Sequence, residues 1–177
     1  MIRKVEVVPH NSNWQSGFED ESMQLALAFG DNTIAIHHIG STSIPTIYAK
    51  PIIDILVEVK DIEKVDDRNT QIEALGYVAM GEFGIVGRRF FRKDNTVGIR
   101  THHLHIFEAS SAQVIRHLAF RDYMRSHPED AQKYSELKQK LAQQYPEDIE
   151  RYMDGKAEFI RELDRKAAAW MRSVKSS

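Results

Sequence analysis

The chain has 177 residues, of which 42% are hydrophobic, and a formal net charge of −2 at pH 7. The length is typical of a single domain with its own core, and the near-neutral charge gives no general reason to expect nucleic acid or an anionic membrane as a partner. Because the sequence contains no cysteine, disulfides and thiol chemistry are excluded, which fits a cytoplasmic protein, and no apolar run approaches the length of a bilayer-spanning helix.

The N-terminal part predicts a helix followed by a strand. Trp14 and Phe18 begin an apolar pattern at helical spacing, so residues 13–29 are expected to form an amphipathic helix. Residues 34–39 alternate in the manner of a strand and end directly before a glycine.

A turn and a buried strand follow. The turn consists of a glycine and three hydroxyl side chains, namely Gly40, Ser41, Thr42 and Ser43. The glycine allows a sharp bend or a close approach to a ligand, and the hydroxyls can cap a helix start, where free N–H groups favour an anion. Pro45 suits the first turn of a short helix. Residues 51–59 then form an almost continuous apolar run, which predicts a strand buried on both faces.

The remaining chain predicts a few more strands and then helices only. A helix is expected at residues 61–75, a strand at 77–80, and a hairpin with arms at 88–92 and 97–107. Three further helices are expected at about 111–125, from Pro128 to Tyr145, and at about 147–171. This order predicts an α/β or α+β fold, as one domain over residues 1–177 with a helical part at about 111–173.

Asp54 interrupts the apolar run of the second strand. Aspartate is rarely buried unless something pairs with it, and this one follows the Gly-Ser turn after a short loop. We therefore expect Asp54 to contact a metal or a substrate, because ionisable groups of this kind gather at functional sites. The alternative is a structural aspartate that caps the turn or pairs with a basic side chain.

Three histidines can converge near Asp54 if their strands are neighbours. His103 and His105 alternate, so they share one face of the predicted strand, and His38 leads directly into the Gly-Ser turn. Two histidines on one face can share a metal or flank a phosphate. With one aspartate they suit a transition metal better than Mg²⁺. The alternative is one hydrogen-bonded core histidine and one exposed histidine.

Basic side chains can bring positive charge to the same place. Lys50 precedes the Asp54 strand, and four arginines crowd the predicted hairpin, namely Arg88, Arg89, Arg92 and Arg100. Arginine matches phosphate by a two-pronged contact, and we expect Arg89 to reach the pocket. Lys138 and Lys156 each follow a tyrosine at helical spacing; we expect them at the surface, with the pocket as the alternative.

Several of these segments resemble the GrpB-like family of the nucleotidyltransferase superfamily. The joint pattern HIGSTSIP and AKPIIDI carries the likeness, which runs along most of the chain and includes HHLH at residues 102–105 and the two tyrosine–lysine pairs. The family has a glycine after the proline and usually an acidic residue before the histidine, where this sequence has Thr46 and His37. The resemblance implies a nucleotidyltransferase-like mixed β-sheet flanked by helices, with a C-terminal helical segment.

The superfamily resemblance also implies a metal-binding pair of acidic residues, of which this sequence has only the first. In the superfamily a Gly-Ser turn is followed by Asp-x-Asp or Asp-x-Glu on the next strand, and these carboxylates hold a divalent metal against a triphosphate. Here Leu56 occupies the second acidic position. Glu58 lies about 13 Å along the strand from Asp54, which is too far for both to bind one metal.

Three functions are compatible with the pattern. The first is transfer of a nucleoside phosphate from a nucleoside triphosphate to an unidentified acceptor, with Mg²⁺ or Mn²⁺, or Zn²⁺ as the alternative. The second is a catalytically degenerate module that binds a nucleotide or another anion, and the third is a His/Asp metal-dependent hydrolase. The residues expected at the site are Asp54, His103 and His105 for catalysis and the metal, and Gly40, Ser41, Thr42, Ser43, His38, Lys50 and Arg89 for phosphate or substrate. The acceptor and the oligomeric state do not follow from the sequence.

Overall fold

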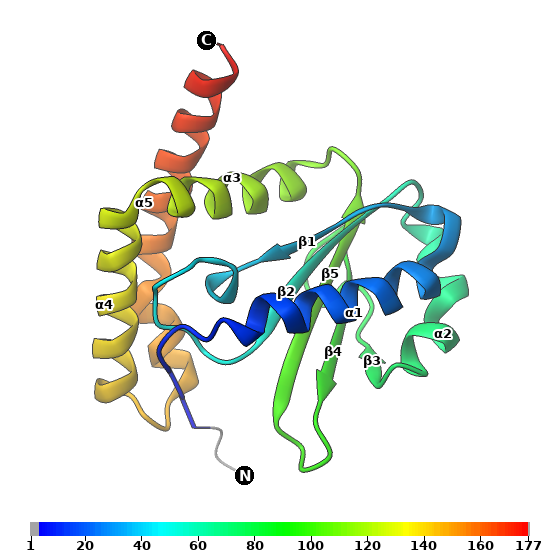
Figure 1. Ribbon diagram of the computed structural model, residues 1–177, viewed down its shortest axis with the longest axis horizontal. Helices are drawn as coiled ribbons and strands as arrows, with labels where there is room; N and C mark the ends of the chain where they lie inside the picture. The colour runs from blue at the N-terminus through cyan, green and yellow to red at the C-terminus, as the bar shows by residue number, and fades with distance from the viewer. Residues whose placement is uncertain (1–3, 177) are drawn as a thin grey trace.

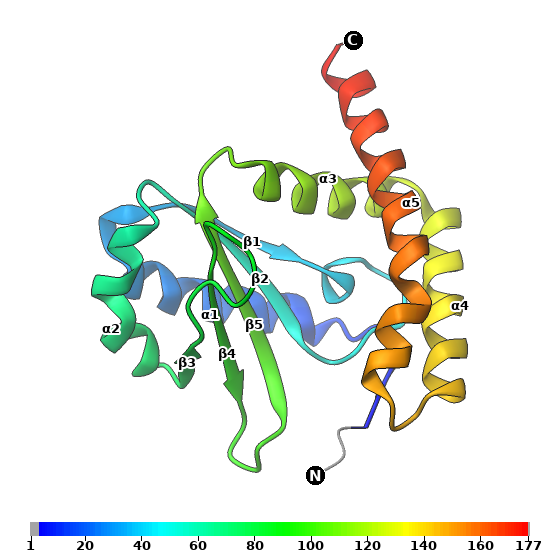
Figure 2. The ribbon, with the colours of Figure 1, turned by 180° about the vertical axis from the view of Figure 1, so that it is seen from behind.

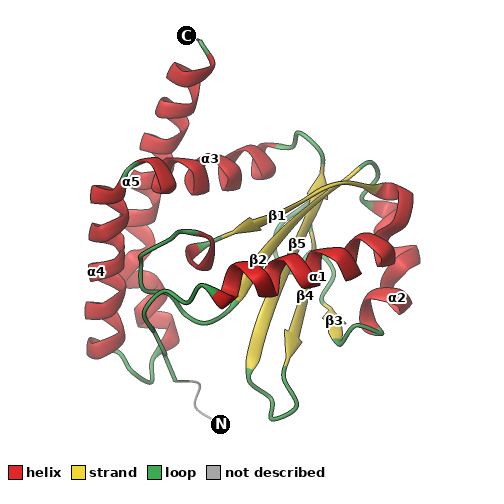
Figure 3. Cartoon of the chain, in the orientation of Figure 1, coloured by secondary structure: helices red, strands yellow, loops and turns green. Residues whose placement is uncertain are grey.

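The structure is a computed structural model that describes residues 4–176, and at its centre lies a five-stranded sheet with the order β1-β2-β5-β4-β3 (Figures 1 and 3). The strands are β1 (Thr33–Ile39), β2 (Ile53–Val59), β3 (Tyr77–Ala79), β4 (Arg89–Asp94) and β5 (Arg100–Glu108). β2 and β5 run parallel, and the other neighbouring pairs are antiparallel. The predicted mixed sheet is therefore confirmed, with β2 and β5 starting two and three residues later than the sequence pattern indicates.

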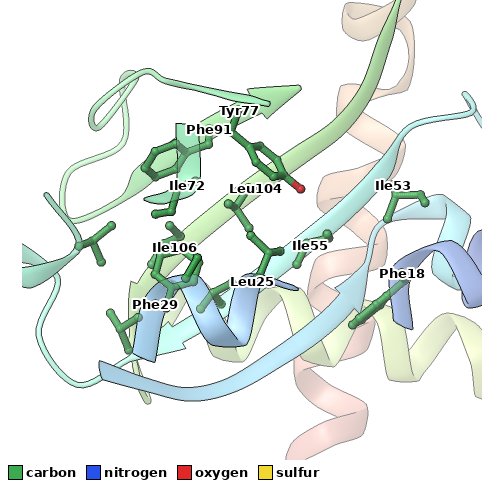
Figure 4. Close-up of a cluster of buried hydrophobic side chains, with 14 of the residues drawn as sticks. Phe18, Leu25, Phe29, Ile53, Ile55, Ile72, Tyr77, Phe91, Leu104 and Ile106 are labelled. Atoms are coloured by element: carbon green, nitrogen blue, oxygen red, sulfur yellow. The ribbon is translucent and has the colours of Figure 1, made fainter. Parts of the chain in front are cut away.

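One face of the sheet is covered by α1 (Asn13–Phe29) and by the short α2 (Asn69–Glu73). The main hydrophobic core lies here, where alternate side chains of the strands pack against α1 (Figure 4). Ile55 and Leu56 are both fully buried although they point to opposite faces. β2 is thus buried on both faces, as its continuous apolar run predicts.

The helix predicted at residues 61–75 is wrong in extent. The segment forms a 3-10 helix at Glu63–Arg68 and then only the five residues of α2. Only Val65 and Ile72 are buried within these two elements, so the segment has little apolar surface with which to stabilise a long helix. Aspartate, asparagine and threonine between them also favour turns over helix interiors.

The C-terminal helical segment is confirmed. Its helices are α3 (Ala112–Ser126), α4 (Pro128–Gln144) and α5 (Ile149–Lys175). Figure 2 shows α4 and α5 side by side at one end of the sheet, with the last turns of α5 projecting beyond it. None of the helices between residues 4 and 176 is long and apolar enough to span a membrane.

The chain between β1 and β2 joins the sheet to these helices. Ile44 and Ile47 are fully buried, and they belong to a second hydrophobic cluster made mostly by α3, α4 and α5. The Gly-Ser turn directly before them is therefore held between the two cores. The turn therefore lies between the sheet and the C-terminal helices (Figure 1).

Candidate functional site

The Gly-Ser turn packs directly on Asp54. Gly40 has φ 71°, and a Cβ atom at this residue would lie 2.6 Å from Asp54 Oδ2, so both the backbone conformation and the close approach require glycine. Ser41–Ser43 form a single 3-10 turn, and the short helix expected at Pro45 is absent, since the chain continues through a turn instead. Thr46 in that turn has φ 74°, which is the left-handed region and is unusual for a β-branched residue.

Two histidines of β5 converge on Asp54, as expected. β2 and β5 pair so that Asp54 lies opposite His103, and His105 is on the same face. His103 Nδ1 and His105 Nε2 are each 3.4 Å from Asp54 Oδ1. Burial alone would raise the pKa of Asp54, but the hydrogen bonds from these two histidines outweigh it and hold the pKa well below its usual range. Asp54 is therefore ionised at every physiological pH.

An arginine contacts each histidine at the ring nitrogen that faces away from Asp54. Arg88 Nη1 is 3.4 Å from His105 Nδ1, and Arg100 Nη1 is 3.3 Å from His103 Nε2. Arginine can only donate, so each histidine must accept on that nitrogen and carry its proton on the nitrogen that faces Asp54. These five side chains thus form one hydrogen-bonded chain, in the order Arg88–His105–Asp54–His103–Arg100. In it each donor points toward the Asp54 carboxylate.

This chain does not fit the metal centre expected from Asp54, His103 and His105. A histidine binds a metal through a nitrogen lone pair, whereas in this arrangement the nitrogens that face Asp54 act as hydrogen-bond donors to its carboxylate. Within residues 4–176, no group of three or more His, Cys, Asp or Glu side chains is arranged to hold a metal ion. We therefore propose no reaction step that uses a metal bound by Asp54, His103 and His105.

Among residues 4–176, no second carboxylate joins Asp54 at the pocket in place of the one that Leu56 does not supply. Leu56 is fully buried and packs with Ile39 and Phe107. Glu58, the next acidic residue on this face of β2, is engaged by His37, with 2.5 Å between Oε2 and Nε2. His37 stands directly before His38, where the family usually has an acidic residue, and it thus pairs with Glu58 instead.

A pocket of about 220 Å³ opens between the Gly-Ser turn and the C-terminal helices. On the sheet side it is lined by Ser41, Thr42, Asp54 and His103. On the helix side it is lined by Lys138 of α4, by Tyr152 and Lys156 of α5, and by Lys50 from the loop before β2. Three lysines therefore face one carboxylate, and the pocket has an excess of positive charge.

The two helix lysines are buried, so the expectation of surface lysines is wrong. Lys138 is 1% exposed and Lys156 is 8% exposed. Burial, together with the positive charges of Lys156 and Lys50, lowers the pKa of Lys138 to about 6. Burial and the charge of Lys50 lower the pKa of Lys156 to about 8, against the attraction of Asp54. Each amine is destabilised as a cation by its surroundings, and the anionic group of a ligand would stabilise the cation of the amine that it contacts.

Each of these lysines lies over the tyrosine one helical turn before it. Lys138 Nζ is 4.4 Å from the ring centre of Tyr134, and Lys156 Nζ is 4.8 Å from that of Tyr152. Tyr134 shares a hydrogen bond with Ser41, and its burial raises its pKa to about 12. The Tyr152 hydroxyl is buried and has no hydrogen-bond partner among residues 4–176. A buried polar atom without a partner is costly and indicates a place for a ligand or water.

Two residues predicted for the site lie elsewhere. Arg89 points to the opposite face of β4 and makes a two-pronged contact with Asp66, at 2.8 and 3.2 Å. His38 also faces the α1 side, where it packs on Phe18 and bonds to Gln15. Its other nitrogen is 2.9 Å from the Thr42 hydroxyl, so His38 supports the Gly-Ser turn from behind. Of the remaining predicted residues, Ser41, Thr42, Lys50, Asp54 and His103 line the pocket, whereas Gly40, Ser43 and His105 are not among its lining residues.

The sequence carries one signal for the two buried lysines. Tyr134 and Lys138, and again Tyr152 and Lys156, repeat the same tyrosine-to-lysine spacing on two helices. Such a repeat places one tyrosine–lysine pair on a single face of each helix, so both pairs can line the same pocket. The repeated spacing can be read from the sequence. Whether those helix faces are exposed to solvent or packed toward the sheet depends on how α4 and α5 pack against the rest of the fold.

Comparisons with known proteins give one family over nearly the whole chain. The sequence model described as GrpB protein matches residues 4–166. UPF0157 protein YqkA of Bacillus subtilis is 48% identical over 170 residues, which are 96% of this chain and 49% of that protein, so the chain spans about half of its length. Glutamate-rich protein GrpB of Alkalihalophilus pseudofirmus is 36% identical over 165 residues, 90% of this chain and 94% of that protein.

A solved structure agrees with the same assignment. The crystal structure of conserved protein GrpB from Enterococcus faecalis is 44% identical, with a TM-score of 0.87, over 92% of this chain and 96% of that chain. The sequence pattern around the Gly-Ser turn, the family match and the fold thus agree, and the chain belongs to the GrpB family.

Proposed function

We propose that the protein binds a phosphate-bearing small molecule, and specifically a nucleotide, in the pocket between the sheet and helices α4 and α5. The observation that supports this best is the convergence of Lys50, Lys138 and Lys156 on the Gly-Ser turn. Buried amines that their surroundings disfavour as cations are stabilised when a ligand supplies the counter-charge. A nucleotide phosphate supplies that charge, and the superfamily resemblance favours it over other anions.

In this proposal the two walls of the pocket have different tasks. Ser41 donates a hydroxyl hydrogen bond to a phosphate oxygen, and the lysines balance the phosphate charge. Asp54 stays ionised and repels a phosphate placed directly on it. The phosphate therefore lies on the lysine side, and Asp54 faces the other end of the ligand, where it accepts hydrogen bonds from hydroxyl groups of a sugar or an acceptor.

Nucleotidyl transfer is the second candidate. It is favoured by one observation, the ionised Asp54 packed on the Gly-Ser turn, which matches the first half of the superfamily pattern. The fully buried Leu56 at the second acidic position counts against it. We therefore place binding first and transfer second, and we do not propose the metal-dependent hydrolase, because its His/Asp metal set does not fit.

Calorimetric titration with the four nucleoside triphosphates, each with and without Mg²⁺ or Mn²⁺, tests the proposal. We expect at least one nucleotide to bind to the wild type. Lys156→Met should weaken it about 10- to 100-fold, because a charge-assisted hydrogen bond contributes about 1.5–3 kcal/mol. Lys140→Met, which removes an exposed lysine of α4, is the matched control and should bind as the wild type does. No binding of any nucleotide or of inorganic phosphate contradicts the proposal.

Asp54→Asn decides whether a cation enters with the nucleotide. If the lysines alone balance the phosphate charge, the variant binds at least as tightly as the wild type and with the same metal dependence. If a divalent cation bridges Asp54 and the phosphate, the variant loses the Mg²⁺- or Mn²⁺-dependent part of the affinity. The second result would restore the metal requirement that the superfamily resemblance implies.

A further inference from the structure

We propose that Lys138 is a nucleophilic amine, and that it forms an imine with the carbonyl group of a phosphorylated aldehyde or ketone bound in the pocket. The proposal rests on the proposed function only for the phosphate end of the ligand. It adds a covalent chemistry at the helix wall that nucleotide binding does not require.

Among residues 4–176, the surroundings of Lys138 offer a permanent positive charge only one carbonyl and one aromatic ring. Its Nζ donates a hydrogen bond to the backbone carbonyl of Tyr48 and lies over the ring of Tyr134. Within residues 4–176, no carboxylate lies at ion-pair distance from it. An almost fully buried ammonium with one carbonyl partner is therefore less stable there than a neutral amine.

The neighbouring charges act in the same direction. Lys156 from α5 and Lys50 from the loop before β2 are the cations that face Lys138, and Tyr134 and Tyr152 offer only ring faces and hydroxyls. Burial and these two cations lower the pKa of Lys138 to about 6. A lysine desolvated next to other cations keeps its lone pair at neutral pH, and this is the setting in which lysine acts as a nucleophile on carbonyl carbon.

Lys138 is also one of the residues that line the pocket. Lys138 shares the pocket of about 220 Å³ with Ser41 and Lys50, which bind a phosphate in the proposed function. This volume suits a small phosphorylated molecule. The Tyr152 hydroxyl, without a partner among the described residues, is a donor available on the same wall for the ligand's oxygen.

The reaction balances without an oxidant or reductant. The Lys138 nitrogen attacks the carbonyl carbon, and the C=O π electrons move to oxygen, which takes a proton from the Lys156 ammonium. The attacking nitrogen then loses one proton to the Lys156 amine. In the second stage the nitrogen lone pair forms the C=N bond, and the hydroxyl group takes the proton now held by Lys156 and leaves as water. The sum is carbonyl plus amine plus one proton giving a protonated imine and water.

Pyridoxal 5′-phosphate, a phosphorylated aldehyde, is the probe that tests the proposal. The full chain is incubated at pH 7 with less than one equivalent of probe, reduced with borohydride, and mapped by peptide mass spectrometry. We expect Lys138 to carry the reduced adduct at least tenfold more than the exposed Lys140 on the same helix. Unphosphorylated pyridoxal should label Lys138 at least tenfold less, and inorganic phosphate should compete with the phosphorylated probe.

Two variants and one comparison make the result decisive. Lys138→Met should lose the adduct and Lys140→Met should keep it, with circular dichroism checking that both fold. Lys138→Arg puts a permanent cation in place of the nucleophilic amine, and it should also lose the adduct if Lys138→Met does not fold. An adduct spread over exposed lysines, or found on Lys156 alone, overturns the proposal. If nucleotide or phosphate binds by calorimetry while Lys138 stays unlabelled, only the imine is refuted and the proposed function stands.

Discussion

At the scale of single residues, Thr46 holds a backbone conformation that its side chain disfavours. Its φ is 74° and its side chain is exposed in the turn after the Gly-Ser motif. GrpB-like sequences resemble this one but have glycine there, and glycine adopts this conformation without a steric penalty. The strain of a non-glycine residue in this region is about 1–3 kcal/mol.

Thr46→Gly is therefore expected to stabilise the protein by about 1 kcal/mol, after the extra entropy of glycine in the unfolded chain is subtracted. No buried contact is lost, since the threonine is exposed. Urea unfolding followed by circular dichroism measures the change. Thr46→Ala, which still carries a Cβ atom, is the control and should gain much less. A Thr46→Gly protein less stable than the wild type would show that the threonine side chain contributes something this explanation omits.

The histidines beside Asp54 give a second prediction at this scale. Because an arginine donates to the far nitrogen of each ring, His105 should carry its proton on Nε2 and His103 on Nδ1 at pH 7.5. Long-range ¹H–¹⁵N NMR correlation spectra distinguish the two neutral tautomers from each other and from the imidazolium. Arg100→Met removes the donor to His103 Nε2 but leaves Asp54 as the acceptor for Nδ1, so it should weaken the Nδ1–H preference of His103 without abolishing it, while His105 is unchanged. Two equal tautomers in the wild type would instead leave the ring nitrogens available to a metal.

At the scale of elements, helix α4 carries a buried amine at Lys138 that changes stability with pH. In the unfolded chain a lysine titrates near 10.4, whereas burial and nearby cations lower the pKa of Lys138 to about 6 in the folded protein. The unfolded state therefore binds more protons between about pH 6 and 10, and the stability contributed at this residue rises with pH across that window.

Lys138→Met removes this titration while keeping a long flexible side chain. We expect the variant to be more stable than the wild type by several kcal/mol near pH 6. The advantage should shrink by up to about 1.4 kcal/mol per pH unit as the pH rises to 10. Chemical denaturation at half-unit steps of pH measures it, with Lys140→Met as a control whose difference from the wild type should stay flat. A flat difference for Lys138→Met as well would mean that the folded amine titrates like a free lysine.

The elements also show which parts of the structure follow from local sequence. β2 could be predicted because burial on both faces leaves a continuous apolar run, and Asp54 is conspicuous within it. Arg89 could not be placed, because the pairing of Phe90 with His105 sends its neighbour Arg89 to the other face of the sheet. That register depends on two strands at once, and side chains one residue apart face opposite ways.

At the scale of the whole molecule, the pocket depends on the docking of two separate cores. The Gly-Ser turn could be recognised from its residues, and Lys138 and Lys156 could be recognised as helix positions. Their meeting could not, because it requires Ile44 and Ile47 to insert among α3, α4 and α5. The sequence therefore predicts the sheet wall of the candidate site well and the helix wall poorly.

This arrangement gives the last prediction, which concerns the coupling of the two cores. A ligand that contacts Ser41 on one side and Lys156 on the other joins the sheet to helix α5, and it stabilises only the state in which both walls are in place. At about 100 times its dissociation constant, such a ligand adds about 2.7 kcal/mol to the free energy of unfolding. Hydrogen–deuterium exchange with and without the tightest nucleotide found by calorimetry measures where that stabilisation appears.

We expect slower exchange in Ser41–Ser43 and in the turns of α4 and α5 around Lys138 and Lys156, to a similar degree on both walls. Exchange in α2, on the far side of the sheet, should change less. In Lys156→Met the protection should fall on both walls together, because the ligand then loses its contact with α5. Protection confined to the Gly-Ser turn would mean that the ligand touches the sheet alone, and the lysines of the helices would then need another explanation.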